Sequence, residues 1–192
     1  MYNLLSKEEK EKALIVDLKK DQLLFHENEI CEYVALVISG QIEIKSYDLS
    51  GKEIVYNITN AGGIFANNLL FSNDKAFKGN VIATVDTSLA LIDEQNLITI
   101  LMNNEAFLRK YLSVQAQSMK QLNFMMKLLS FDSARDRFLY YLEYHHKMIT
   151  IYSITQLSKE LFLTRETLSR LISSLVKEGL IIKEKQLIKL VN

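Results

Sequence analysis

Residues whose types could read a base pair gather in one short segment, "LTRETLSRLISSLVKEGLI", at positions 163–181. They are Arg165, Glu166, Ser169 and Arg170. The planar fork of arginine can bond O6 and N7 of guanine together, and a glutamate carboxylate can accept from N4 of cytosine. A solvated surface pair between Glu166 and Arg170 is the simpler interpretation, but it contributes at most about 0.5 kcal/mol and leaves the whole group unexplained. The group therefore indicates a helix that meets the major groove of DNA.

The elements around this group are those that could hold such a helix. Its apolar face consists of Leu168, Leu171, Ile172 and Leu175, opposite the polar residues. Thr164 has the residue type of an N-cap, and Gly179 stands where a helix C-cap needs positive φ. A shorter helix is expected at about 155–161, and "LIIKEKQLIKLV" predicts two strands around a Glu-Lys-Gln turn. Two helices, a tight turn and a hairpin predict a winged helix-turn-helix. Side chains suited to phosphate contacts surround it: Thr164, Thr167, Ser173, Lys177, Lys183 and Lys185.

Short strands separated by turn residues fill the first half of the chain. "SKEE", from Ser6, has capping-box spacing and predicts a short helix that ends near Val16. Between Asp21 and about Ile92, segments such as "YVALVISGQIEIKSYD", "GKEIVYNI" and "VIATVDTSLALI" are rich in β-branched residues and carry glycine turns between them. This pattern predicts a small antiparallel β-barrel of the jelly-roll kind.

A long helix is predicted from Glu105, where apolar residues recur at spacings of four and three. The seam consists of Leu108, Leu112, Gln115, Met119, Leu122, Met126 and Leu129. A seam of about three heptads is the pattern that pairs two helices in a coiled coil. Burial within one chain is the alternative, but the single polar Gln115 favours a parallel homodimer and fixes its register. A second apolar strip predicts that this helix also packs against its own barrel, and it consists of Tyr111, Val114, Met125 and Leu128.

These elements predict an α+β chain of three parts. Residues 1–104 are expected to form the β-barrel, 105–131 the dimerisation helix, and 132–192 the winged helix-turn-helix domain. The break at "FDS", residues 131–133, is the expected hinge, and Ser133 is expected to begin a new helix.

Charge is unevenly distributed although the formal net charge is zero. Residues 1–104 carry 9 Lys and Arg against 15 Asp and Glu, a balance of −6. Residues 105–149 and 150–192 each carry 7 against 4, a balance of +3. The C-terminal half is thus the part that suits an anionic partner. Since no apolar run approaches the ~20 residues of a membrane span, we expect a cytoplasmic protein with no membrane partner.

The order of barrel, long helix and winged helix-turn-helix resembles the cAMP receptor protein/FNR (Crp/Fnr) family of bacterial transcription regulators. The likeness covers the chain from about Leu18, and "TRETLSRLISSLVKEGLI" follows the family's recognition helix. It implies a homodimeric, sequence-specific DNA-binding regulator that is not an enzyme, with RNA polymerase as a further partner. It also implies that the barrel of residues 1–104 is a sensor domain like the cyclic-nucleotide-binding domain. Arg165, Glu166 and Arg170 match the cAMP-type base-reading positions, and the resemblance implies inverted TGTGA-like half-sites. Phe162 replaces the glycine usual in the family's turn, so the turn is expected to differ or to be strained.

The ligand site is where the sequence departs from the family. The residues that would hold the ribose and the cyclic phosphate align with Ala66-Asn67 and Phe77-Lys78. An effector pocket, if the protein has one, is expected from Phe65, Asn67, Asn68, Phe77, Lys78, Leu122 and Asn123. Because Lys78 lacks the bidentate geometry of arginine, cAMP is not expected as the effector. A small hydrophobic or anionic metabolite, or no ligand at all, remain open.

No cofactor or metal is expected. One cysteine, Cys31, excludes a four-thiolate iron–sulfur cluster within the chain, and a buried, inert thiol is the favoured interpretation. His26 is a candidate haem ligand, but a lone histidine at a barrel turn is more often an ordinary turn residue.

Two alternative functions remain open. One is a ligand- or haem-sensing module whose winged helix binds protein. The other is a cupin-like barrel enzyme, which would need several histidines converging from strands. The chain has three histidines, two of them adjacent at a predicted helix end.

Overall fold

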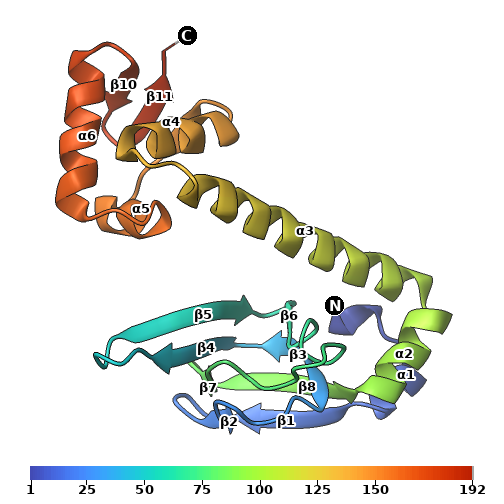
Figure 1. Ribbon diagram of the computed structural model, residues 1–192. Helices are drawn as coiled ribbons and strands as arrows, with labels where there is room; N and C mark the ends of the chain where they lie inside the picture. The colour runs from blue at the N-terminus through green and yellow to red at the C-terminus, as the bar shows by residue number, and fades with distance from the viewer. Residues whose placement is uncertain (192) are drawn as a thin grey trace. The chain divides into compact units, whose positions relative to one another are not determined.

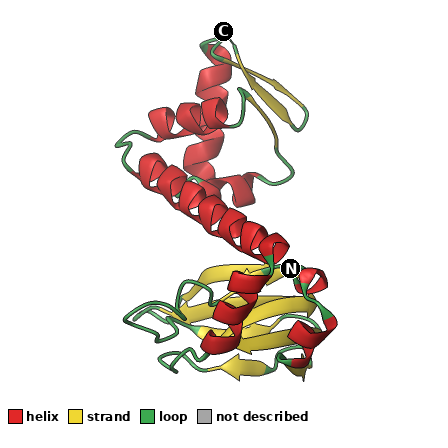
Figure 2. Cartoon of the chain, turned by 90° about the vertical axis from the view of Figure 1, so that its right-hand side faces the viewer, coloured by secondary structure: helices red, strands yellow, loops and turns green. Residues whose placement is uncertain are grey.

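The chain forms two compact units in the computed structural model, which describes residues 1–191. The units span Met1–Val114 and Gln115–Asn192, and helix α3 (Glu105–Leu129) supplies residues to both. Each unit has its own hydrophobic core. Figure 1 labels the elements, and Figure 2 shows that strands dominate the first unit and helices the second.

The N-terminal unit is built on two four-stranded antiparallel sheets, with strand orders β1-β8-β3-β6 and β2-β7-β4-β5. The strands are β1 Leu14–Leu18, β2 Leu23–Phe25, β3 Tyr33–Ser39, β4 Gln41–Tyr47, β5 Glu53–Asn60, β6 Ile64–Phe65, β7 Asn80–Ala83 and β8 Thr87–Asp93. The helical elements are the 3-10 helix η1 Tyr2–Leu4, then α1 Lys7–Glu11 and α2 Glu94–Asn103. Two antiparallel sheets around one core are the predicted jelly roll.

Strand β3 shows why this unit closes around its core. Its run Val34–Val37 is fully buried, without the alternation of a strand that faces water on one side. Such a run is typical of a strand covered on both faces, and η1 and α2 both contact β3. The turn after β3 needs Gly40, at φ +84°, because a Cβ there would lie 2.7 Å from Cα of Thr87.

In the N-terminal unit, one prediction is wrong in detail and one helix was not predicted. The first helix ends at Glu11, not near Val16, because residues from Leu14 pair with β8 as strand β1. The capping box itself is confirmed, since Ser6 and Glu9 bond each other's backbone amides. Helix α2, capped by Asp93, was not foreseen by the sequence pattern. In both cases the tertiary environment decided between the available local patterns.

The C-terminal unit is a winged helix-turn-helix. It contains α4 Ala134–Tyr144, β9 Met148–Thr150, α5 Ile154–Glu160, α6 Arg165–Lys177, β10 Ile181–Glu184 and β11 Leu187–Leu190. Ser133 caps α4 as predicted, and the predicted short helix corresponds to α5. The hairpin β10–β11 is confirmed, and β9, a strand that was not predicted, pairs with β11 as the third strand.

Helix α3 begins at Glu105 as predicted and divides its buried residues between the two cores. Tyr111 and Val114 pack in the N-terminal core, as the second strip predicted. Leu128 instead belongs to the core of the C-terminal unit, so its predicted contact with the barrel is wrong. A single long helix can serve two cores because side chains more than four turns apart lie over 20 Å apart along its axis.

Candidate nucleic-acid interface and sensor site

Helix α6 is held in place by its cap and its apolar face. The Thr164 side chain accepts a hydrogen bond from the backbone N–H of Thr167 at 3.1 Å. This bond satisfies one of the backbone N–H groups of the first turn that have no partner within the helix. Leu168, Ile172 and Leu175 are buried, and Leu171 of the predicted face is half-buried. The amphipathic pattern therefore fixes which side of α6 faces the unit and which faces away.

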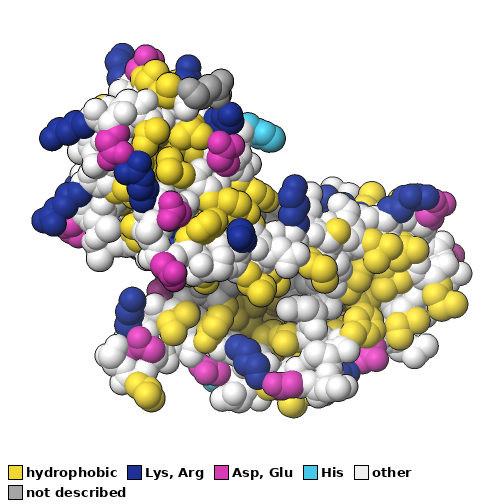
Figure 3. Space-filling model, turned by 45° about the horizontal axis from the view of Figure 1, so that its top comes forward, with side chains coloured by type: hydrophobic (Ala, Val, Ile, Leu, Met, Phe, Trp, Pro, Cys, Tyr) yellow, Lys and Arg dark blue, Asp and Glu magenta, His cyan; other side chains and the backbone are white. Residues whose placement is uncertain are grey.

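The opposite side of α6 presents the four predicted base-reading residues, all of them exposed: Arg165, Glu166, Ser169 and Arg170. The simple Glu166–Arg170 surface pair does not form within residues 1–191, where the ion pair of this unit joins Arg135 to Glu178 at 2.7 Å. In Figure 3, Lys and Arg side chains project from the left edge of this unit, the side on which Figure 1 draws α6. The guanidinium groups of α6 are thus open to a partner.

The predicted phosphate-contacting residues lie at the rim of this face. The side-chain oxygens of Thr164 and Thr167 are 2.9 Å apart, at the start of α6. An open cleft of about 370 Å³ lies between α6 and β10, and its lining includes Ser173, Lys177 and Lys183. Lys185 stands in the hairpin turn at φ +52°. Hydroxyl and ammonium groups on both sides of a cleft suit a sugar–phosphate backbone.

The turns on either side of α6 differ in how they use positive φ. Phe162, between α5 and α6, has φ +54°, a conformation that a bulky side chain seldom adopts, so the strained turn expected from its sequence is present. Gly179, after α6, has φ +73°. There Leu180 N–H donates to Leu175 O and Gly179 N–H to Val176 O, which is the bonding pattern of a Schellman motif.

The predicted heptad seam of α3 is largely open to solvent. Leu112, Met119, Leu122, Met126 and Leu129 are between 50% and 69% exposed, while Leu108 and Gln115 are half-buried. A row of large apolar side chains on one helix face is unusual on a surface that stays in water. Burial within one chain, the alternative that the sequence left open, does not account for these five residues.

The residues predicted to line an effector pocket have very different environments. Phe65 and Phe77 are fully buried, and Phe77 stacks on Phe25 with ring centroids 5.0 Å apart. Lys78 is exposed, and its ammonium group pairs with Asp74 at 2.6 Å. The two aromatic rings therefore help to fill the barrel core, and the nearby cation already has an anionic partner.

Two asparagines of the predicted pocket, Asn67 and Asn68, lie on the loop after β6, which begins at Ala66 with φ +62°. The backbone carbonyl of Asn67 accepts a hydrogen bond from the Tyr111 hydroxyl at 3.2 Å, and Asn68 is exposed. Leu122 and Asn123, also exposed, lie on the part of α3 that belongs to the other unit. The structure thus brings Phe65, Asn67, Asn68, Phe77 and Lys78 into one unit.

The single thiol is buried. Cys31 donates a hydrogen bond to the carbonyl oxygen of Tyr33, and burial raises the pKa of its thiol. A raised pKa lowers the thiolate fraction, and the thiolate is the reactive form. No group of three or more His, Cys, Asp or Glu side chains in the described part of the chain is arranged to hold a metal ion.

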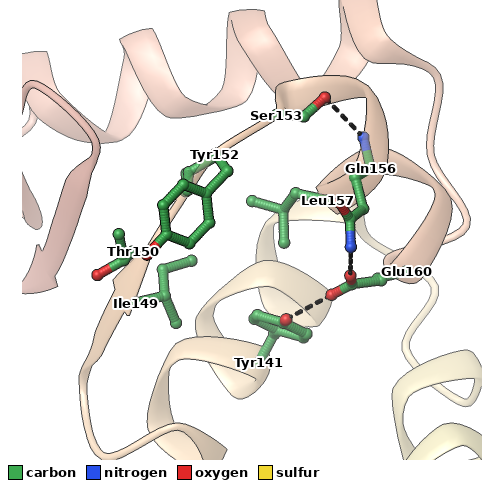
Figure 4. A pocket seen from close by; sticks show the side chains of 9 residues that line it. Tyr141, Ile149, Thr150, Tyr152, Ser153, Gln156, Leu157 and Glu160 are labelled. Carbon is green, nitrogen blue, oxygen red and sulfur yellow. Dashed lines mark hydrogen bonds between the residues drawn. The ribbon is translucent and has the colours of Figure 1, made fainter. Parts of the chain in front are cut away.

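A cleft beside α5 was not predicted (Figure 4). The Tyr141 hydroxyl donates to the Glu160 carboxylate at 2.7 Å, and the Gln156 amide donates to its other oxygen. Burial, followed by this contact with Glu160, raises the pKa of the Tyr141 hydroxyl above its usual range. The sequence offered no signal for the cleft, because its residues come from α4, β9 and α5.

A jelly-roll domain, a long helix with an open apolar seam and a winged helix-turn-helix together define the two-domain class of transcription regulators. Residues 15–104 match the model of the cyclic nucleotide-binding domain. Over 171 residues, 82% of this chain and 74% of the relative, the chain is 22% identical to the cyclic AMP receptor protein of Thermus thermophilus. The chain is thus similar to the Crp/Fnr regulators, in its cyclic nucleotide-binding domain and over most of its length.

Solved structures share the fold. The catabolite activator protein of Thermus thermophilus superposes with a TM-score of 0.58 at 19% identity, over 97% of this chain and 91% of that one. A mutant of CooA from Carboxydothermus hydrogenoformans gives 0.63 at 22% identity, over 95% and 85% of the two chains. In the described residues, no helix is both long enough and apolar enough to cross a membrane.

Proposed function

We propose that the protein is a homodimeric transcription regulator that reads inverted TGTGA-like half-sites in double-stranded DNA and works without enzymatic chemistry. The observation that carries this proposal is the exposed face of α6, where Arg165, Glu166, Ser169 and Arg170 stand opposite a buried apolar face. Arginine and glutamate supply the donor and acceptor groups that distinguish base pairs in the major groove. Thr164, Thr167, Ser173, Lys177, Lys183 and Lys185 would contact phosphates.

The dimer brings two such helices to one site. The exposed seam of α3 supports pairing with a second copy, because a parallel coiled coil would cover these side chains. A two-fold symmetric dimer matches an inverted repeat whose half-sites lie about one helical turn apart.

The sensor domain, we propose further, does not use cAMP. By the sequence resemblance, Phe77 takes the position of the phosphate-binding arginine of the Crp/Fnr family. Its side chain is packed in the core against Phe25. The neighbouring Lys78 is paired with Asp74 and offers a point charge without a bidentate fork. RNA polymerase is the expected partner once the dimer is bound at a promoter.

A fluorescence anisotropy titration tests the DNA proposal. The probe is a duplex with two inverted TGTGA half-sites, and the competitor is a duplex of the same composition in scrambled order. We expect at least about 10³-fold tighter binding to the specific duplex at one salt concentration, and weaker binding to both at higher salt. Equal affinity for the two duplexes, with and without cell extract to supply an effector, would refute sequence-specific recognition.

The cAMP proposal has its own measurement. Isothermal titration calorimetry of the purified protein with cAMP is expected to give no heat of binding at ligand concentrations up to about 1 mM. A dissociation constant above that concentration corresponds to a very weak site. A saturable heat with micromolar affinity would overturn it.

A further inference from the structure

Arg137, in α4, joins two segments of the C-terminal unit through their backbone carbonyls. Its Nη2 donates to the carbonyl of Phe131 at 2.9 Å. Its Nη1 donates to the carbonyls of Leu161 at 3.2 Å and Phe162 at 3.4 Å. Phe131 lies just after the end of α3, and the other two residues form the turn between α5 and α6. One guanidinium therefore links the segment that follows α3 to the turn that precedes the recognition helix.

That turn needs support from outside itself. Phe162 holds a left-handed backbone conformation at φ +54°, which costs free energy for a residue with a bulky side chain. Its side chain is 47% exposed, so burial of the ring compensates only in part. Leu161 is the C-cap of α5, where backbone carbonyls lack intrahelical partners and a positive charge is favourable. The Arg137 side chain supplies both the donors and the charge.

The position of Arg137 costs free energy, because its guanidinium is partly buried without an acidic partner in the described part of the chain. Its Nε is buried and has no hydrogen-bond partner. No carboxylate within residues 1–191 lies at ion-pair distance from its guanidinium, unlike that of Arg135 on the same helix, which pairs with Glu178. A partly buried cation that is satisfied by carbonyls alone is expensive unless those contacts are needed.

We propose that Arg137 is a positioning residue for DNA reading. It holds the left-handed turn at Phe162 and thereby sets the direction in which α6 leaves α5, and it ties that turn to Phe131. Only Leu163 and the cap Thr164 separate this turn from α6. A change of φ at Phe162 therefore changes the direction of the axis of α6. The inference rests on the proposed function for its effect on DNA, but its effect on the turn is independent of DNA.

The first test uses hydrogen–deuterium exchange without DNA. The amides of Phe162 and Leu163 donate to Lys159 O and Ser158 O, so their exchange reports on the turn. In the variant Arg137→Met we expect these amides to exchange about tenfold faster or more, while the amides of the wing strands keep their rates. The control Arg135→Met, which removes an exposed cation from the same helix, should leave the turn unchanged. Unchanged exchange in Arg137→Met would overturn the proposal.

The second test measures DNA affinity in a double-mutant cycle. Arg137→Met should lower the affinity for the specific duplex about tenfold and leave that for the scrambled duplex nearly unchanged. Adding Phe162→Gly should restore the affinity to within about threefold, because glycine adopts positive φ without support. Failure of glycine to restore affinity would refute the role of the turn.

Two further outcomes are informative. If the turn loosens in Arg137→Met but the unsubstituted protein does not discriminate between the duplexes, the proposed function fails and the role of Arg137 in the turn stands. Should Arg137→Met not fold, Arg137→Lys replaces it, since lysine keeps the charge and loses the fork. That variant should show the same faster exchange at the turn amides, and wild-type exchange would overturn the proposal.

Discussion

Arg170→Ala is the substitution that best separates base reading from general attraction to DNA. Arg170 lies exposed on α6 and has no ion-pair partner within residues 1–191, so its removal should change the free energy of unfolding by no more than about 0.5 kcal/mol. Lys177, at the C-terminal end of the same helix, is also exposed and provides a matched control. The two variants remove one cation each from one helix.

The expected magnitude follows from the two-fold symmetry of the proposed complex. Loss of one bidentate contact to guanine costs about 1–3 kcal/mol, and a dimer loses two such contacts, about 2–6 kcal/mol in all. Arg170→Ala should therefore weaken binding to the specific duplex roughly 30-fold or more. Lys177→Ala should instead weaken all sequences about equally and reduce the slope of log affinity against log salt by about 2, one for each protomer.

The assay is anisotropy titration of three proteins against two duplexes at two or more salt concentrations. Thermal unfolding of each variant, followed by circular dichroism, checks that the fold is retained. If both variants lose affinity equally on specific and scrambled duplexes, Arg170 does not read a base. A lowered melting temperature in Arg170→Ala would show that its role is structural.

Four further measurements test other parts of the molecule. Met119→Glu places a charge in the exposed seam of α3 and should turn the dimer into a monomer by light scattering at micromolar concentration; a monomeric parent protein would contradict the seam argument. Leu168→Ala empties a fully buried site and should cost about 2–5 kcal/mol in urea unfolding. Thr164→Ala removes the α6 cap and should cost about 1 kcal/mol in the same assay. Cys31 should react with a thiol reagent slowly in the folded protein and rapidly in urea; fast reaction in the folded state would refute its burial.

The architecture was predictable because its main elements have strong local periods. The change to a helical period predicted the start of α3 at Glu105. Ser133 and Thr164 have residue types that favour the N-cap position, and they predicted the starts of α4 and α6. The elements that were missed, β1, α2 and β9, are short or follow directly on another element. Their residues fit more than one local pattern, and pairing with β8 and β11 decided the two strands.

The interface and the sensor site differ in how far sequence could define them. Arg165, Glu166, Ser169 and Arg170 share one helix face, so spacing alone predicts their exposure on one side. The predicted pocket draws on a loop and a separate helix, and spacing cannot tell whether an aromatic ring lines a cavity or fills a core. The stack of Phe77 on Phe25 joins residues more than fifty positions apart, and only the folded barrel brings them together.

The sequence by itself determined the polar and apolar faces of α6, the seam of α3 and the absence of a second thiol, because helical period and residue counts are local properties. Only the tertiary structure decided that Leu128 packs in the C-terminal core, that Lys78 is paired with Asp74, and that Arg137 bonds three backbone carbonyls. The periodicity of a helix or strand cannot predict such contacts, because the groups that they join belong to different elements or loops. They depend on which elements pack together, which is a property of the whole fold.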